Sequence, residues 1–280
     1  MRISTKARMN RMFTNGGCLD VAIDHGVCNE PSFMGGLEDI GSVVDQLITA
    51  GPDAIQMNYG QADLLQSRPD KPKPALVMRI DMGNPYNDRR HRAMWSQLQN
   101  ADEPIIGALE MDAAAVVVNL FMLPDEPDLF HQCVANIAKV RAACSKYGMP
   151  LMIEPLVMLP NDVRGGYQVD GDVEKIATLV RLSAEMGADV IKADPTTNAE
   201  DYHRVIEAAR CPVLVRGGGK EDLKTVLIKS ADVMAQGAQG MVYGRNIYQH
   251  DNPKKVVAAL MAIIHKGASG EEAWDIYQSG

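Results

Sequence analysis

Long hydrophobic runs are missing from this sequence of 280 residues. No stretch reaches the roughly 18 apolar residues that a membrane-spanning helix needs. The basic segment at residues 1–8 is not followed by the apolar segment of roughly 7–15 residues that a secretory signal requires. We therefore expect no association with a membrane and a cytoplasmic location.

Cysteine and histidine are also scarce, and their positions do not suggest a metal site. The five cysteines are odd in number and none forms a CxxC pair, so neither a disulfide framework nor a zinc site is indicated. Of the six histidines, only His25 is expected at the end of a strand, whereas zinc-assisted carbonyl chemistry generally needs several histidines around one ion. We expect no metal ion in the site.

An excess of positive charge is absent as well. The 28 Lys and Arg residues are outnumbered by 36 Asp and Glu residues, which gives a net charge of -8. Proteins that bind nucleic acids usually carry a basic stripe, so we expect no nucleic-acid partner. An anionic small molecule would have to be drawn by a local cluster of arginines, lysines and backbone amides.

What the sequence does contain is an alternation of eight short apolar segments with eight helical patterns. Such apolar runs are typical of parallel strands covered on both faces, and the count of eight favours a closed (β/α)8 TIM barrel over an open doubly wound sheet. We predict one α/β domain over residues 1–280, with an N-terminal helix within 1–14, the barrel over 15–266 and a tail over 267–280. The expected strands lie within residues 18–26, 53–57, 74–81, 114–120, 150–155, 188–195, 212–216 and 239–243.

The segments around the barrel are predicted in less detail. Residues 84–92 and 161–170 are expected to be loops, and a helix is expected over residues 93–111. The tail suits a final short helix with Trp274 and Tyr277 on one face. An exposed aromatic face would suit a contact between subunits, so we expect a homo-oligomer.

Charged and polar side chains stand at the expected carboxyl ends of the strands, where barrels of this type place their active sites. Lys192 ends the sixth strand. Removal from water favours a neutral amine, which attacks carbonyls and forms a Schiff base. The alternative is a lysine that reaches from a strand end into solvent. The other expected strand ends carry Asp24, Asn58, Arg79, Asp81, Asn119, Glu154, Arg216 and Arg245, and this concentration of charge favours a catalytic Lys192.

Glu154 and Asp24 are the candidate acid–base groups. Forming and breaking an iminium needs a proton shuttle, which a carboxylate with a raised pKa can provide. For either residue the alternative is a salt bridge to a neighbouring cation. His25 could share in proton transfer or bond a loop carbonyl, and we favour the second role.

Two glycine-containing loops follow the last two strands. Gly217, Gly218 and Gly219 can expose backbone amides, and Gly244 with Arg245 opens another loop in a region where barrels commonly bind phosphate. The run lacks the GxxxxGK[ST] spacing of a nucleotide-binding loop, and a plain turn is the alternative. We predict a phosphate site here. Further candidates for binding the substrate or a second anion are His25, Arg79, Asp81, Arg89, Arg90, Arg164 and Arg216.

Five segments together carry a resemblance to a known group of enzymes. They are Asp24-His25-Gly26, Glu154-Pro155-Leu156, Lys192-Ala193-Asp194, Arg216-Gly217-Gly218-Gly219 and Gly244-Arg245. They resemble the class I aldolases of the DhnA, deoxyribose-phosphate aldolase-like and tagatose-bisphosphate aldolase group, over roughly residues 15–265.

The resemblance implies a Schiff-base aldolase of carbohydrate metabolism, for example of glycolysis, that needs no cofactor. Lys192 would condense with the ketone of a phosphorylated ketose, and cleavage would give dihydroxyacetone phosphate or a similar ketone and an aldehyde. Asp24 would hold or deprotonate a substrate hydroxyl. The phosphate would be held by Gly217, Gly218, Gly244 and Arg245.

One departure from the group concerns the proton donor. Archaeal-type fructose-bisphosphate aldolases that this chain resembles have a tyrosine in a Met-Tyr-Pro-Arg-Gly segment after strand five. This sequence reads Met158-Leu159-Pro160-Asn161-Asp162 there. The setting of Glu154 is instead similar to that in tagatose and sulfofructose phosphate aldolases, which implies a different ketose and moves proton transfer to Glu154.

Other activities stay open within the same fold group. It contains a coenzyme A dependent acetyltransferase and synthases of amino-dideoxy-heptulosonate, both of which also use a barrel lysine. A barrel that binds a sugar phosphate without chemistry is a further alternative, and in that case Lys192 would be unreactive.

Overall fold

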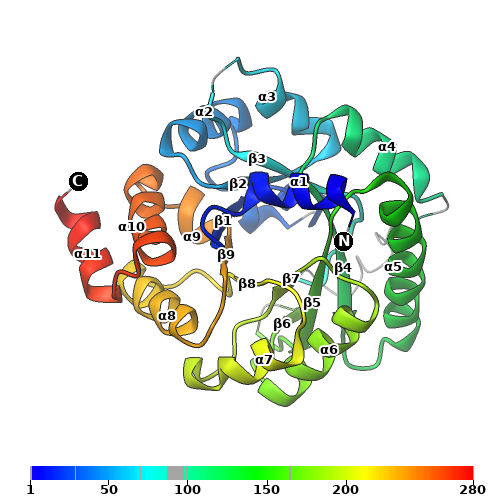
Figure 1. The fold of residues 1–280 in the computed structure, drawn as a ribbon. Helices are drawn as coiled ribbons and strands as arrows, with labels where there is room; N and C mark the ends of the chain where they lie inside the picture. The colour runs from blue at the N-terminus through cyan, green and yellow to red at the C-terminus, as the bar shows by residue number, and fades with distance from the viewer. Residues whose placement is uncertain are drawn as a thin grey trace.

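The computed structural model describes residues 2–28, 30–69, 71–86, 98, 100–163 and 165–279. The chain forms a single (β/α)8 TIM-barrel domain, as the sequence predicted, in which eight parallel strands close into a ring (Figure 1). A ninth strand is a short antiparallel addition. The strands are β1 Cys18–Ala22, β2 Ala54–Asn58, β3 Ala75–Arg79, β4 Ala115–Met122, β5 Leu151–Pro160, β6 Tyr167–Val169, β7 Val190–Ala193, β8 Val213–Arg216 and β9 Gly240–Tyr243. Pairing of β4 with β5 and of β1 with β9 completes the ring.

Helices surround the barrel between successive strands (Figure 1). Several begin at a side chain that caps free backbone amides; Asp172, for example, accepts hydrogen bonds from the amides of Glu174 and Lys175. The helices are α1 Ile3–Met12, α2 Ile40–Ala50, α3 Ala62–Gln66, α4 Asp102–Glu110, α5 Pro127–Tyr147, α6 Val173–Glu185, α7 Tyr202–Ala208, α8 Leu223–Ala235, α9 Arg245–Tyr248, α10 Pro253–Lys266 and α11 Gly270–Ser279. None of the helices in the described part of the chain is long and apolar enough to cross a membrane.

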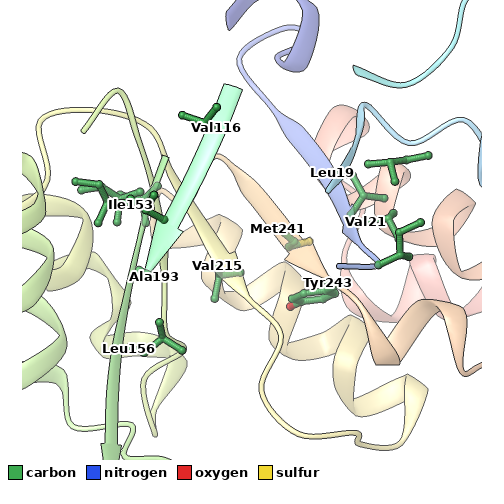
Figure 2. Close-up of a cluster of buried hydrophobic side chains, with 14 of the residues drawn as sticks. Leu19, Val21, Val116, Ile153, Leu156, Ala193, Val215, Met241 and Tyr243 are labelled. Carbon is green, nitrogen blue, oxygen red and sulfur yellow. The ribbon is translucent and has the colours of Figure 1, made fainter. Parts of the chain in front are cut away.

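The main hydrophobic core lies between the strands and the surrounding helices. Side chains alternate along each strand, so every second residue leaves the barrel and packs outward. Figure 2 shows this for Leu19 and Val21 on β1 and for Met241 and Tyr243 on β9. Burial of these apolar surfaces is the dominant force that holds the helices on the barrel.

The inward-facing side chains form a second cluster at the amino-terminal end of the barrel. Helix α1 lies across this end in Figure 1. Its residues Met9 and Met12 belong to one buried cluster with inward-facing strand residues such as Cys18, Val77 and Val117. The interior near the amino-terminal end is therefore mostly apolar, with Asp20 as a buried exception, and the other charged inward residues lie toward the carboxyl end.

The expectation of a loop over residues 161–170 is wrong in part. Strand β5 does not end at Pro155 but continues to Pro160, and β6 pairs with this extension in the antiparallel direction. Gly165 and Gly166 have φ values of 77° and 63°, a left-handed conformation that lets the chain reverse between the two strands. The local sequence does not predict the extension, because proline usually interrupts a strand.

The expectation for the tail is also corrected. Helix α11 does form, but Trp274 and Tyr277 are partly buried and pack against the main core. Their rings are stacked with centroids 5.4 Å apart. Both side chains are therefore only partly exposed, so the aromatic face is smaller than expected. Of the helix predicted over residues 93–111, the structure describes α4 from Asp102 onward, and residues 93–97 and 99 lie outside the described residues.

Candidate active site

A small cavity of about 70 Å³ opens at the carboxyl end of the barrel, as the strand-end pattern predicted. It is lined by charged side chains from several strands and by the two glycine-containing loops. Of the predicted site residues, Asp81 and Gly219 do not line it; Asp81 is buried behind it and Gly219 is exposed outside it. The predicted residues that line it are Asp24, His25, Arg79, Glu154, Lys192, Arg216, Gly217, Gly218, Gly244 and Arg245.

Lys192 lines this cavity and is 5% exposed, so it does not reach into solvent. It stands on the inward face of β7, where the short strand places its ammonium among polar groups from neighbouring strands. Its Nζ lies 3.0 Å from Oε1 of Glu154 and donates to Oε1 of Gln56 at 3.3 Å. A carboxylate in direct contact with a buried amine is placed to exchange a proton with it.

Glu154 is surrounded by positive charge. Besides Lys192, its carboxylate contacts Nη2 of Arg79 and lies 3.8 Å from Nε of Arg216. Burial by itself raises the pKa of this carboxyl, but the charges of Lys192, Arg79 and Arg216 outweigh burial and hold the pKa well below its ordinary value. The expectation of a raised pKa is therefore wrong for the resting protein, in which the Glu154 carboxylate is ionised.

Arg79 connects three carboxylates at the centre of the site. Its Nε donates to Oδ2 of Asp24 at 2.8 Å, its Nη1 donates to Oδ1 of Asp81 at 3.2 Å, and its Nη2 contacts Glu154. Burial opposes ionisation of Asp24, but the charges of Arg79 and Lys192 outweigh it and lower the pKa of Asp24. The guanidinium of Arg79 is thus directed at protein carboxylates, which differs from the expected role of binding a substrate anion.

Asp81 is buried and holds Arg79 in place from the side away from the cavity. It accepts hydrogen bonds from the backbone amide of Asn119 at 2.7 Å and from the Asn119 side chain at 3.0 Å. With Arg79, these partners occupy both of its oxygens. Both oxygens of Asp81 are thus bonded to groups of the protein, which differs from the expected role in binding a substrate.

Arg216 is held in a similar way by groups of the protein. Its Nη1 donates to Oδ1 of Asp194 at 2.6 Å, and its Nη2 donates to the hydroxyl of Tyr86 at 2.7 Å. Asp194 in turn accepts a hydrogen bond from the amide of Val157 at 2.7 Å. Burial raises the pKa of Asp194 to about 6, although the charge of Arg216 opposes this effect.

Arg245 differs from the other arginines of the site because no carboxylate in the described part of the chain pairs with it. Its guanidinium lies 4.1 Å from the ring centroid of Phe33, and its Nη2 donates to the carbonyl of Gly218 at 3.3 Å. Burial lowers the pKa of Arg245. An anionic group in the cavity would supply the missing negative charge.

The loop that carries Arg245 approaches the first strand closely. A Cβ at Gly244 would lie 2.5 Å from Cε1 of His25 and 2.7 Å from the carbonyl oxygen of Ala22. Only glycine fits between these atoms, so the loop position depends on Gly244. On the other side, the amide of Gly217 donates to the carbonyl of Val242, which holds the two glycine-containing loops together.

His25 is a neutral side chain in this site. Burial lowers its pKa to about 4, although the nearby Asp24 opposes this effect. Its ring packs edge-on against Phe33 and Tyr248, and its Nδ1 has no hydrogen-bond partner among the described residues. We expected a hydrogen bond between His25 and a loop carbonyl, and Nδ1 does not form one.

The sequence reading missed Gln56, which joins two of the functional groups. Gln56 is fully buried, donates to Oδ2 of Asp24 at 2.6 Å and accepts from Lys192. A signal was present, because Gln56 interrupts an apolar strand two residues before its polar end, at a position that faces inward. Asp194 stood in the segment Lys192-Ala193-Asp194 but was given no role of its own. Tyr86 and Phe33 carried no comparable signal, because their roles depend on contacts with distant segments.

Comparison with known proteins places the chain in a family. The profile of the DeoC/LacD family aldolases matches residues 18–250. The chain belongs to the DeoC/LacD aldolase family. This aldolase is accordingly a carbon–carbon lyase.

The aldolase is similar over nearly its whole length to curated proteins. It is 29% identical over 98% of its length to an uncharacterised aldolase of Saccharolobus solfataricus, 99% of which is covered. It is 28% identical over 95% of its length to a 2-amino-3,7-dideoxy-D-threo-hept-6-ulosonate synthase of Halobacterium salinarum, 94% of which is covered. Its fold matches a Schiff-base-forming fructose-1,6-bisphosphate aldolase with a TM-score of 0.75 at 22% identity, over 93% of this chain and 100% of the other.

Proposed function

We propose that this aldolase cleaves or forms a phosphorylated ketose through a Schiff base on Lys192, without a cofactor. The observation that carries the proposal is the buried contact of 3.0 Å between Nζ of Lys192 and the ionised Glu154, both of which line the cavity. Cleavage would give dihydroxyacetone phosphate or a similar ketone, together with an aldehyde.

In the first step Glu154 takes a proton from the ammonium of Lys192, and the resulting amine attacks the ketone carbonyl. The carbinolamine then loses its hydroxyl as water, for which Glu154 returns the proton, and an iminium forms. The positive charge that began on the ammonium ends on the iminium. The charges that surround Glu154 are therefore the same before and after the step.

Carbon–carbon cleavage needs a second base. We assign this role to Asp24, whose ionised carboxylate lines the cavity and is fixed by Arg79 and Gln56. Asp24 takes the proton of the hydroxyl on the leaving carbon, the bond to that carbon breaks, and its electrons move to the iminium to give an enamine. The aldehyde leaves, and protonation and hydrolysis of the enamine release the ketone.

The roles of the arginines follow from their partners. Arg79 and Arg216 are positioning residues, because their guanidinium groups are held by carboxylates of the protein. Arg245, with Gly217, Gly218 and Gly244, forms the site for the phosphate. Arg89, Arg90 and Arg164 lie outside the described residues, and they remain candidates for a second anion at the far end of the substrate.

Replacing Arg245 with Ala is expected to raise KM for the phosphorylated substrate about 10–100-fold, because a hydrogen bond to a charged group contributes about 1.5–3 kcal/mol. KM for the same ketose without its phosphate should hardly change. Arg204→Ala, on the exposed side of α7, serves as the control. An equal loss for both substrates would contradict a phosphate site at Arg245.

Replacing Glu154 with Gln is expected to slow imine formation by roughly 10²–10⁴-fold, because the amide cannot accept the proton of Lys192. The measurement is the rate at which an imine is trapped, with thermal unfolding recorded on the same samples. Glu174→Gln on the exposed face of α6 is the matched control. Trapping at the wild-type rate would show that another group takes the proton.

The overall activity is tested by incubating the protein with a series of ketose phosphates and measuring the ketone phosphate that is released. Release from at least one of them, without any added cosubstrate, supports the aldolase. The similarity to a named synthase favours a second candidate, in which the same lysine forms a carbon–carbon bond. Activity that requires a second carbonyl substrate would favour the synthase, and activity that requires coenzyme A would favour acyl transfer.

A further inference from the structure

Asp20 is a buried carboxyl group to which neither the sequence reading nor the proposed reaction gives a role. Asp20 and Ala22 on β1, and Asp24 just after it, alternate with the outward-facing residues Leu19, Val21 and Ile23, so all three point into the barrel. Asp20 is 0% exposed and pairs in register with Val242 of β9. It therefore lies beneath Asp24, between the cavity and the apolar floor that α1 covers.

The two oxygens of Asp20 have no hydrogen-bond partner in the described part of the chain. The other buried aspartates near the site contrast with this, because Asp81 and Asp194 both accept hydrogen bonds from an arginine and from a backbone amide. An ionised carboxylate without hydrogen bonds in an apolar interior is strongly disfavoured. Asp20 is therefore stable in this place only when it carries its proton.

Four charged groups act on Asp20. Lys192 on β7 and Arg79 on β3 favour its ionisation, whereas Asp24, which follows β1, and Glu154 on β5 oppose it. Cys18, on the same face of β1, is buried and feels the charge of Asp20 as well. Burial is the largest influence and raises the pKa of Asp20 to about 8.

The charges of these four groups sum to zero, because two are positive and two are negative. They are therefore balanced as long as Asp20 is neutral. Ionisation of Asp20 would add a third negative charge, and the buried interior would transmit its effect to Lys192. No direct hydrogen bond joins Asp20 and Lys192 among the described contacts, so the influence acts through space.

We propose that Asp20 is a positioning residue for the lysine chemistry: it keeps its proton in the resting protein, and its ionisation would hold the proton on Lys192 and suppress imine formation. This inference rests on the proposed function. It assigns Asp20 no contact with the substrate. It explains why a polar residue interrupts the apolar floor at this position, where an apolar side chain would pack more easily.

The first test compares the wild type with Asp20→Asn across pH 6–9. The initial rate at which cyanoborohydride traps the adduct with dihydroxyacetone phosphate is measured at each pH. Dividing the rate of one protein by that of the other cancels the pH dependence of the reagent. We expect the two proteins to react at equal rates near pH 6. At pH 9, about one pH unit above the pKa of Asp20, the wild type should react about tenfold more slowly than Asp20→Asn, because most of its Asp20 is then ionised. Asp20→Leu should behave like Asp20→Asn, and Asp275→Asn on the exposed face of α11 is the control.

The possible results separate the two proposals. A ratio that stays constant with pH, with adducts in both proteins, would overturn the role of Asp20 and leave the Schiff base intact. The absence of an adduct in every protein would overturn the proposed function, and the role of Asp20 with it.

A second test follows thermal unfolding and needs no substrate. The pKa of Asp20 is raised in the folded protein, so folding retains a proton that the unfolded chain releases between about pH 4 and pH 8, and wild-type stability falls as pH rises through this window. Asp20→Asn lacks this contribution. Its melting temperature relative to the wild type should therefore increase from pH 5 to pH 8, and a difference that is constant over this range would contradict a protonated Asp20.

Discussion

Replacing Lys192 with Ala is expected to abolish the adduct that borohydride traps with dihydroxyacetone phosphate. The same change should lower cleavage of the ketose by on the order of 10⁴-fold or more, because the reaction loses its covalent electron sink. Mass spectrometry of peptides locates the adduct in the wild type, and a coupled assay measures cleavage. The expected position of the reduced adduct is Nζ of Lys192.

The variant should still fold, because Glu154 keeps Arg79 and Arg216 as counter-charges when Lys192 is removed. Circular dichroism and thermal unfolding check this. Lys254 is an exposed lysine on α10, and Lys254→Ala is the control. Its adduct should form as in the wild type. An adduct on a surface lysine that persists in Lys192→Ala would contradict the mechanism and favour a barrel that binds the ligand without chemistry.

Replacing Arg79 with Met is expected to have the largest effect on stability, a loss of about 3–5 kcal/mol in the free energy of unfolding at pH 7. Arg79 is 8% exposed and contacts Asp24, Asp81 and Glu154, so its removal leaves three buried carboxylates without their shared counter-charge. Urea denaturation measures the difference. Imine trapping should fall as well, because Glu154 and Asp24 lose their fixed positions.

The effect of Arg79→Met should depend on pH. Arg79 helps to lower the pKa values of Asp24 and Glu154 in the folded protein, which stabilises the fold above the unfolded values near pH 4, and this contribution is lost as pH falls. The difference between wild type and variant should therefore shrink on acidification below about pH 4. Arg79→Lys should rescue stability in part, because it restores one charge but not the three-way contact. Unchanged stability of Arg79→Met at pH 7 would show that the carboxylates do not depend on this arginine.

These two predictions test different properties of one buried network. Lys192 supplies the reactive amine, whereas Arg79 fixes the two carboxylates that would move protons. Because the network is almost closed to solvent, its charges act strongly on each other. Loss of a single member should therefore alter the protonation of the others, which is also the basis of the role inferred for Asp20.

Much of the fold could be predicted from local sequence patterns. The apolar runs and the helical periodicities between them predicted eight strands and a closed barrel, because side-chain burial repeats with the period of each element. Strand lengths were less certain, and the extension of β5 with its partner β6 was missed because Pro155 looked like an end. In β5 the extension is held by pairing with β4 and β6, which no local pattern reveals.

The sequence by itself determined which chemical groups reach the mouth of the barrel, because the ends of parallel strands meet at one edge. Lys192, Glu154, Asp24 and Arg245 could be placed there before any contact was known. Only the tertiary structure decided how they pair: Arg79 contacts Glu154 75 positions away, and Lys192 contacts Gln56 136 positions away. Their charge states follow from these pairings, since burial and neighbouring charges set each pKa. A lowered pKa at Glu154 and a protonated Asp20 are therefore properties of the closed barrel, not of any single segment.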